Sequence, residues 1–243
     1  MGKKLMILGN GPSKNKGLNI VRADNMRLCE LGLSPIEHGI DTWSTNFHLQ
    51  DTENGLIDTP NLRMLFQVHG RELVDIRFKD HYQTFPVKVP LVLVGAPSLI
   101  NEFPTAVMFP MDEYLKRFPF ARILIDNADA VADGLGYGAG MPLEEYHACS
   151  MSYMVALAAM LGIYDKLYIY GVDFDHRLRH ESSFEKGCVE THITAALQMR
   201  PEMTVQIPAE CWLFASHENI RMKYGSEYNP PFSKQEKAAI RRK

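Results

Sequence analysis

The chain has 243 residues, of which 46% are hydrophobic and 23% charged, and this balance indicates one compact folded domain. Its net charge of −3 and its pI near 6.3 argue against a protein that coats nucleic acid through bulk positive charge. No apolar stretch approaches the roughly 20 residues of a membrane-spanning helix, and no signal peptide precedes the first apolar run. The scattered cysteines favour reduced thiols in a cytoplasmic protein over disulfides or a zinc site: Cys29, Cys149, Cys188 and Cys211.

The first predicted element is an apolar strand over residues 4–8, which ends in the loop Gly9-Asn10-Gly11-Pro12-Ser13. Small residues after a strand leave backbone N–H groups at the C-terminal edge of a sheet, where they can bind an anion. The third glycine of a dinucleotide fingerprint is absent, and so is the Gly-Lys-Ser/Thr of a P-loop. Two interpretations stay open: a tight turn, or a nucleotide site of another kind. Lys14 and Lys16 could pair with phosphate there or solvate a helix start.

Strands and helices alternate along the rest of the chain. The predicted helices cover residues 18–31 and 150–161, each followed by a glycine. The further predicted strands are short apolar runs: residues 42–47, 62–68, 89–94, 106–109, 167–170 and 205–207. This alternation predicts an α/β fold with a Rossmann-like, mostly parallel sheet flanked by helices. We assign residues 1–228 to a single domain, with a small lid as an option, and residues 229–243 to a charged C-terminal tail.

Polar residues gather where predicted strands end. In parallel sheets, ligands bind beyond this C-terminal edge, and amide, hydroxyl, carboxylate and imidazole groups there can hold a sugar, a base or a phosphate. Each residue could instead cap a turn or a helix, and the sequence alone leaves that alternative open. The residues in question are Asn10, Ser13, Asn46, His69, Asp173, Asp175 and His176.

Three motifs occur in a recognisable order: Gly9-Asn10-Gly11-Pro12-Ser13, with Asn46 after the next strand; Cys149-Ser150-Met151-Ser152-Tyr153-Met154; and Tyr170-Gly171-Val172-Asp173-Phe174. Together they resemble the bacterial sialyltransferases of glycosyltransferase family 42. They also resemble the broader group of 6-hydroxymethylpterin pyrophosphokinase-like proteins and small phage-encoded proteins. The resemblance covers about residues 4–215. It implies a Rossmann-like sheet that holds a cytidine nucleotide sugar without a metal-binding Asp-x-Asp.

The same resemblance implies roles for matching positions. In the loop that contains Gly9, Gly11 and Ser13, Asn10 would contact the nucleotide, as would Asn46 after the next strand. Ser150, at a helix N-terminus, would face the phosphate or the donor sugar, and Asp173 would lie near the nucleoside. The family has a glycine where this chain has Met151, and its phosphate-gripping tyrosine pair has no clear counterpart here.

Residues 173–181 carry a dense set of reactive side chains. Transfer from a nucleotide sugar needs a base for the acceptor hydroxyl and a cation on the leaving phosphate. His180 or His176 suits the first role because the pKa of histidine lies near neutrality. Arg177 or Arg179 suits the second. A mixed-charge surface loop is the structural alternative.

Three further features lie between or beyond these motifs. Glu190 is a candidate for orienting the base or the donor, and Cys188 is expected to pack against the sheet. Asp173-Phe174-Asp175 has the form of a Mg²⁺ or Mn²⁺ site, which is an alternative to chemistry without a metal. Residues 126–140, acidic and then glycine-rich, predict a lid over the site or an ordinary surface loop.

These observations predict a cytoplasmic glycosyltransferase that needs no cofactor, located in the host cytoplasm if the gene is phage-borne. It would move a sugar from a nucleotide sugar, with a CMP-sugar as the first choice, to a glycan, a small molecule or a phage DNA base. One alternative is a Mg²⁺-dependent diphosphokinase that acts on a small alcohol. Another is a non-catalytic nucleotide-binding module. We also expect a homo-oligomer and no membrane span.

Overall fold

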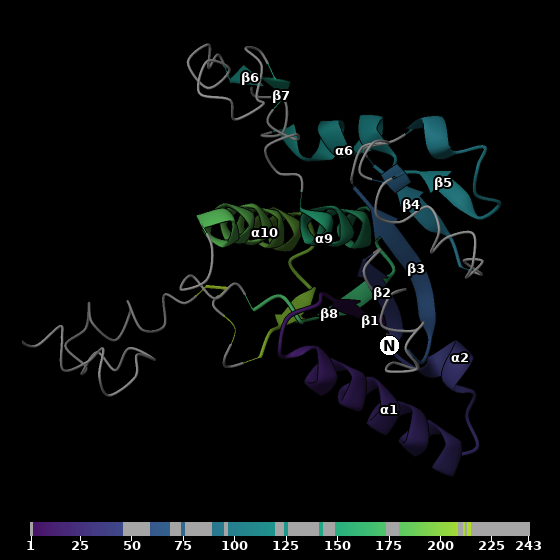
Figure 1. Ribbon diagram of the computed structural model, residues 1–243. Helices are drawn as coiled ribbons and strands as arrows, with labels where there is room; N and C mark the ends of the chain where they lie inside the picture. Colours follow the sequence, from purple (N-terminus) through teal and green to yellow (C-terminus); the bar gives the residue numbers. More distant parts are fainter. Residues whose placement is uncertain are drawn as a thin grey trace, which may run out of the picture.

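The predicted fold class is confirmed. The computed structural model describes residues 2–45, 59–68, 74–75, 89–94, 97–119, 124–125, 141–142, 149–173, 180–208, 211 and 213–214. A seven-stranded sheet, parallel throughout, has the strand order β5-β4-β3-β2-β1-β8-β9 (Figure 1). Its strands are β1 (Lys3–Leu8), β2 (Asp41–Thr45), β3 (Leu62–Gln67), β4 (Leu91–Leu93), β5 (Ala106–Met108), β8 (Tyr164–Tyr170) and β9 (Thr204–Gln206).

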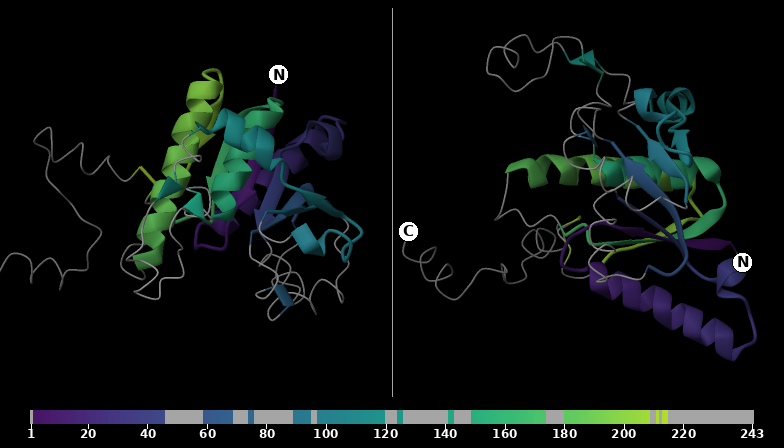
Figure 2. Two further views of the ribbon diagram at one scale, coloured as in Figure 1. Left: turned by 90° about the horizontal axis from the view of Figure 1, so that it is seen from above. Right: turned by 45° about the vertical axis from the view of Figure 1, so that its right-hand side comes forward.

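Helices cover both faces of this sheet. Figures 1 and 2 show α1 on one face of the sheet and the pair of helices α9 and α10 on the other face, where these two lie side by side. None of the described helices is long and apolar enough to cross a membrane. A short antiparallel pair of strands, β6 (Leu124–Ile125) and β7 (Met141–Pro142), is separate from the main sheet. The helices are α1 (Lys14–Glu30), α2 (Pro35–His38), α6 (Met111–Arg117), α9 (Ser150–Leu161) and α10 (His180–Met199), with a 3₁₀ turn at Pro97–Leu99.

The central strand β1 explains why the sheet is covered on both sides. Leu5, Met6, Ile7 and Leu8 are all fully buried. Leu5 and Ile7 pack in the core cluster that contains α9, whereas Met6 and Leu8 pack in the cluster that contains α1. A parallel strand between two helical layers needs apolar side chains at every position, which is why this run is continuous rather than alternating.

The order of the strands sets the place of a ligand site. From β1 the chain moves through β2, β3, β4 and β5 on one side, and it later returns through α9 to add β8 and β9 on the other side. The direction of winding therefore reverses between β1 and β8. In open parallel sheets, ligands bind outside the C-terminal strand ends at such a reversal.

Helix α9 matches the prediction at both ends. It covers Ser150–Leu161, and Gly162 follows in the left-handed conformation (φ +68°) that commonly ends a helix. Residues 151–159 are buried all around the helix, because α9 lies between the sheet on one side and α6 and α10 on the other.

Several element boundaries differ from those predicted. Helix α1 begins at Lys14 rather than at residue 18, and it contains Gly17, which is a poor helix former. A Cβ at Gly17 would lie 2.8 Å from the Cβ of Tyr170, so glycine lets the helix approach the sheet. Strand β8 begins at Tyr164 rather than at residue 167. Helix α6 was not predicted, and neither was the full length of α10, whose first residues fall in the segment expected as a loop.

Helices α6 and α10 meet through a buried histidine. His192 is fully buried; its Nδ1 lies 2.8 Å from the Cys188 carbonyl oxygen and its Nε2 lies 2.8 Å from Tyr114 Oη. A carbonyl can only accept, so Nδ1 donates to it, and in the neutral form of the ring Nε2 accepts from the tyrosine hydroxyl. The rings of Tyr114 and His192 are parallel within 3°. His192 is therefore a packed residue of the core.

We expect Tyr114→Phe to lower the free energy of unfolding by about 1–3 kcal/mol, because it leaves the buried Nε2 of His192 without its donor. Urea unfolding followed by circular dichroism measures this loss. Tyr168→Phe is the matched control, since Tyr168 packs in the other core cluster, on the α1 face of the sheet. Equal effects of the two variants would contradict a specific role for the histidine contact.

Candidate functional site

The ends of β1 and β8 meet through backbone contacts that require glycine. The Gly9 N–H donates to the Tyr170 carbonyl at 2.8 Å, and the Gly11 N–H donates to the Gly171 carbonyl at 2.7 Å. A Cβ on Gly9 would lie 2.2 Å from the Gly171 oxygen. A Cβ on Gly171, whose φ is +71°, would lie 2.4 Å from the Gly9 oxygen. The first and third sequence motifs therefore lie together at the point where the winding of the sheet reverses.

Ser13 joins these two loops through its side chain and its backbone. Its Oγ accepts the Gly171 N–H at 2.7 Å, and its own N–H donates to Asp173 Oδ2 at 2.9 Å. The residue is 2% exposed. Because the N–H groups of Gly9, Gly11 and Ser13 all have protein acceptors, an anion at this loop would be bound mainly by side chains rather than by these three amides.

Asp173 has one oxygen that no described residue satisfies. Its Oδ2 accepts the Ser13 N–H, whereas its Oδ1 is buried without a hydrogen-bond partner. Buried polar atoms in folded proteins nearly always have a partner, so Oδ1 is an acceptor suited to a ligand hydroxyl or amino group. No cluster of three metal-ligating side chains occurs among the described residues, and the second carboxylate of the expected Asp-x-Asp, Asp175, lies outside them.

Lys14 brings a positive charge to the same edge of the sheet. It is the first residue of α1, it is only 6% exposed, and its Nζ lies 3.0 Å from Asn10 Oδ1. A cation at a helix N-terminus is opposed by the helix dipole, and burial of an ammonium group costs further free energy. A bound anion would offset both costs. The sequence left the role of Lys14 undecided because its burial depends on the packing of α1.

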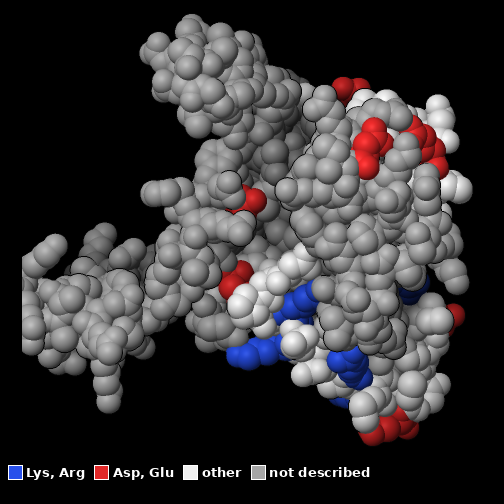
Figure 3. Space-filling view, viewed as in Figure 1, with Lys and Arg blue, Asp and Glu red and all other residues white. Residues whose placement is uncertain are grey.

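Asn10 links this lysine to the next strand. Its Nδ2 lies 3.5 Å from Thr45 Oγ1, at the end of β2. Asn46 follows directly in the chain but lies outside the described residues. Figure 3 shows lysine and arginine side chains in the middle of the face where Figure 1 draws the end of β1 and the start of α1. The ends of β1 and β8 therefore combine amide, ammonium and carboxylate groups within one small region.

The other predicted residues fall into two groups. Ser150 begins α9, which leads back into β8, so its helix N-terminus lies at the same edge of the sheet. His180 begins α10, which leads into β9 in the same way, although its side chain is not described. The remaining predicted site residues, together with the predicted lid and tail, lie outside the described residues: His69, His176, Arg177, Arg179, residues 126–140 and residues 229–243.

Glu190 has contacts that hold the structure together. Its Oε1 accepts the backbone N–H of Phe214 and lies 3.5 Å from the Nζ of Lys186, one helical turn earlier. Phe214 has a positive φ of 50°, which is uncommon for a non-glycine residue. These contacts attach the turn at Leu213 and Phe214 to α10, and the predicted role of Glu190 in orienting a base or a donor stays a prediction.

The two cysteines nearest to the predicted motifs are buried thiols. Burial, followed by the negative charge of Glu185, raises the pKa of Cys149 to about 12 and that of Cys188 to about 12. Both thiols are therefore protonated near neutral pH, and only a thiolate is a strong nucleophile. Cys188 is 2% exposed and packs in the interior, as predicted.

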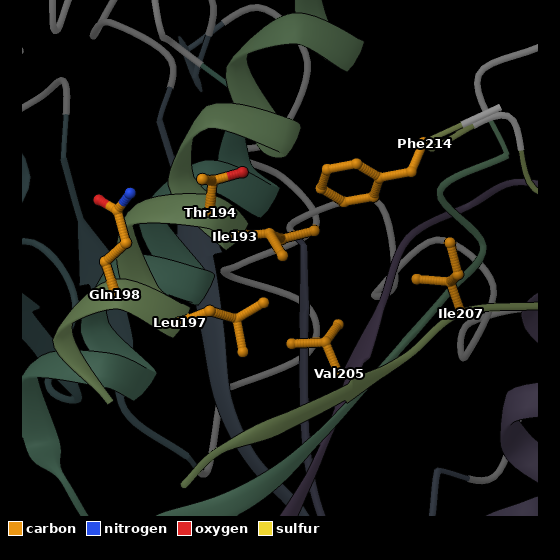
Figure 4. A pocket seen from close by; sticks show the side chains of 7 residues that line it. All are labelled: Ile193, Thr194, Leu197, Gln198, Val205, Ile207 and Phe214. Carbon is orange, nitrogen blue, oxygen red and sulfur yellow. The ribbon is translucent and has the colours of Figure 1, made fainter. Parts of the chain in front are cut away.

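An apolar groove of about 470 Å³ lies between α10 and β9 (Figure 4). None of the described residues that line it is charged, so these walls suit a hydrocarbon or aromatic group rather than a phosphate. The Cys211 thiol donates to the Val172 carbonyl at 3.0 Å, which ties the adjoining turn to the residue before Asp173. The lining residues are Ile193, Thr194, Leu197, Gln198, Val205, Ile207 and Phe214.

Comparison with known proteins leaves the motifs as the basis of the family resemblance. No model of a known protein family matches the chain, and no curated protein matches it either. The resemblance therefore rests on residues 9–13, 149–154 and 170–174. The described parts of the first and third motifs are in direct contact.

We expect Ser13→Ala to destabilise the protein by about 1–3 kcal/mol, because the buried N–H of Gly171 loses its acceptor. Ser150→Ala is the matched control, since it removes a hydroxyl from the partly exposed first turn of α9, and we expect a change within about 0.5 kcal/mol. Urea unfolding measures both variants. A loss for Ser13→Ala no larger than that for Ser150→Ala would contradict the importance of this contact.

We expect a Cys29→Ser variant of the native protein to react slowly with Ellman's reagent at pH 8. The raised pKa values of Cys149 and Cys188 keep these buried groups as thiols, and Cys211 is also buried. The same variant in guanidinium chloride should expose all three remaining thiols. Rapid reaction under native conditions would show that at least one of these buried sites opens readily.

Proposed function

We propose that this protein is a glycosyltransferase that binds a nucleotide sugar in the crevice between the ends of β1 and β8, with a CMP-sugar as the first choice. The observation that supports this most is the pairing of a buried cation with an unsatisfied acceptor in one crevice. Lys14 supplies the ammonium group at the start of α1, and Asp173 supplies a buried oxygen that has no partner among the described residues. A nucleotide carries the matching groups, namely a phosphate and sugar or base donors.

In this proposal each side chain acts on a different part of the donor. Lys14 neutralises phosphate charge, and Asn10 keeps the lysine in place through its side-chain oxygen. Asp173 Oδ1 accepts a hydrogen bond from a ribose hydroxyl or from the amino group of the base. When the bond between the sugar carbon and the phosphate oxygen breaks, negative charge grows on the leaving nucleotide, and a fixed cation stabilises that charge.

The acceptor side of the reaction uses groups near the start of α10. His180 or His176 would take the proton of the acceptor hydroxyl as the new bond to the sugar carbon forms. The neighbouring apolar groove offers a surface for an uncharged part of the acceptor. The leaving nucleotide phosphate takes the electron pair of the broken bond and gains a negative charge. The acceptor hydroxyl gives its proton to the histidine, so the charges of the transfer balance.

The first test is thermal denaturation with CMP, CDP, UDP, GDP, ADP and ATP, each with and without Mg²⁺. A ligand that binds only the folded state raises the melting temperature. We expect CMP or CDP to stabilise the wild-type protein without metal. Lys14→Met should weaken this binding by about 10- to 100-fold, the range expected for loss of one charged hydrogen bond. Lys116→Met, on the exposed side of α6, is the control and should leave the affinity unchanged.

The other outcomes separate the alternatives. Stabilisation by ATP only in the presence of Mg²⁺ would favour the diphosphokinase. Binding of CMP without release of CMP from a CMP-sugar, in the presence of a panel of acceptors, would favour the binding module. No response to any of the six nucleotides would contradict the proposed nucleotide site.

A further inference from the structure

The second half of α1 leaves the core and carries exposed apolar side chains. No residue between Val21 and Ile40 is buried. Figures 1 and 2 show this end of α1, together with α2, projecting beyond the sheet. We call residues 22–38 the α1–α2 corner. Its large apolar side chains are strongly exposed: Met26 by 67%, Leu31 by 63%, Leu33 by 42% and Ile36 by 67%. A cluster of this kind on a folded domain typically marks an interaction surface.

The exposed residues of the second half of α1 lie along one side of the helix. Arg22, Ala23, Met26, Cys29 and Glu30 are all exposed. Their spacing of three and four residues places them along one side of the helix. Leu18 and Val21 face the sheet from the first half of the same helix and are buried. The exposed side is therefore a continuous strip with an apolar centre and a charge at each end.

This strip is symmetric about Met26. Arg22 and Glu30 are each four positions from it, and Ala23 and Cys29 are each three positions from it. Two copies packed antiparallel around a two-fold axis at Met26 would place Arg22 of each copy opposite Glu30 of the other. They would also place a small alanine opposite a cysteine. The strip is thus complementary to itself in charge and in size, as a two-fold interface requires.

We propose that the α1–α2 corner binds a second copy of this chain, with the two α1 helices antiparallel about Met26. Leu31, Leu33 and Ile36 add apolar area at each end of the paired helices. Arg22 also lies within 3.5 Å of Asn19 Oδ1 on its own helix, which holds its side chain along the strip. The corner lies at the end of α1 opposite to Lys14, so both nucleotide crevices stay open in the dimer.

A lipid surface fits the corner less well. The corner contains Arg22 and Arg27 but also Asp24, Glu30 and Glu37, so it has no excess of positive charge. Helices that lie on anionic membranes combine an apolar face with lysine and arginine on the polar face. The mixed charges fit a copy of the same surface better, because Arg22 of each copy then meets Glu30 of the other.

Sedimentation velocity over a hundredfold range of protein concentration tests the proposal. We expect the wild-type protein to dimerise and Met26→Asp to shift the equilibrium to monomer. Val107→Asp is the matched control, because Val107 is an exposed apolar residue (43%) on the edge strand β5, away from the corner. A wild-type protein that stays monomeric throughout, or a dimer that responds only to Val107→Asp, would overturn the proposal.

Charge exchange tests the antiparallel arrangement itself. Arg22→Glu places two carboxylates opposite each other at both ends, and Glu30→Arg places two arginines there. We expect each variant alone to dimerise about tenfold more weakly or worse. A mixture of the two variants should form heterodimers, because the carboxylate introduced by Arg22→Glu then meets the guanidinium introduced by Glu30→Arg, and the native Arg22 meets the native Glu30. The double variant should recover the wild-type dimer. Absence of rescue in both experiments would overturn the register about Met26.

A vesicle experiment separates the lipid alternative. Co-sedimentation with vesicles of phosphatidylcholine and phosphatidylserine should show no binding that depends on Met26. Vesicle binding lost in Met26→Asp, by a protein that is monomeric in solution, would replace the second copy with a membrane surface. None of these measurements requires nucleotide, so their outcome is independent of the proposed activity.

Discussion

The close contact between Gly9 and Gly171 is the constraint on which the rest of the site depends. Neither residue has a Cβ, so the ends of β1 and β8 approach until the backbone of each loop bonds the other. This approach lets the Ser13 hydroxyl reach the Gly171 N–H and lets Asp173 reach the Ser13 N–H. The start of α1 is thereby fixed to both strands, and the two halves of the sheet are joined at the point where their winding reverses.

The sheet was predictable because its strands carry their signal locally. Parallel strands buried on both faces must be apolar at every position, as residues 5–8 of β1 are. Helix α9 was equally clear because it is apolar on all sides and ends at a left-handed glycine. The full length of helix α10 was not, since it buries His192, an imidazole whose partner Tyr114 lies elsewhere in the chain. The start of α1 was missed for a similar reason. Gly17 is a poor helix former, and the close packing against Tyr170 that its missing Cβ allows cannot be read from the local sequence.

The loops of the candidate site could be predicted from the sequence, but the contacts that their residues make could not. Glycines that were expected to expose N–H groups to an anion instead bond the neighbouring strand. The charge that could replace those donors comes from Lys14, whose significance depends on its burial at a helix N-terminus. No local pattern encodes that burial, since it arises when α1 packs on β1 and β8. The contact of Glu190 could not be read from the sequence either, because its partner is the backbone N–H of Phe214, 24 residues further along the chain.

Helix α1 connects the two ends of the molecule that we consider functional. Its first half is held against the sheet by Gly17, Leu18 and Val21, and it presents Lys14 to the crevice at considerable electrostatic cost. Its second half has no buried residue, so the core contributes little to holding it in place. Antiparallel packing about Met26 would supply the missing contacts from a second copy. Dimerisation would then steady the helix whose first turn carries the phosphate-binding cation, and it would do so without covering the crevice.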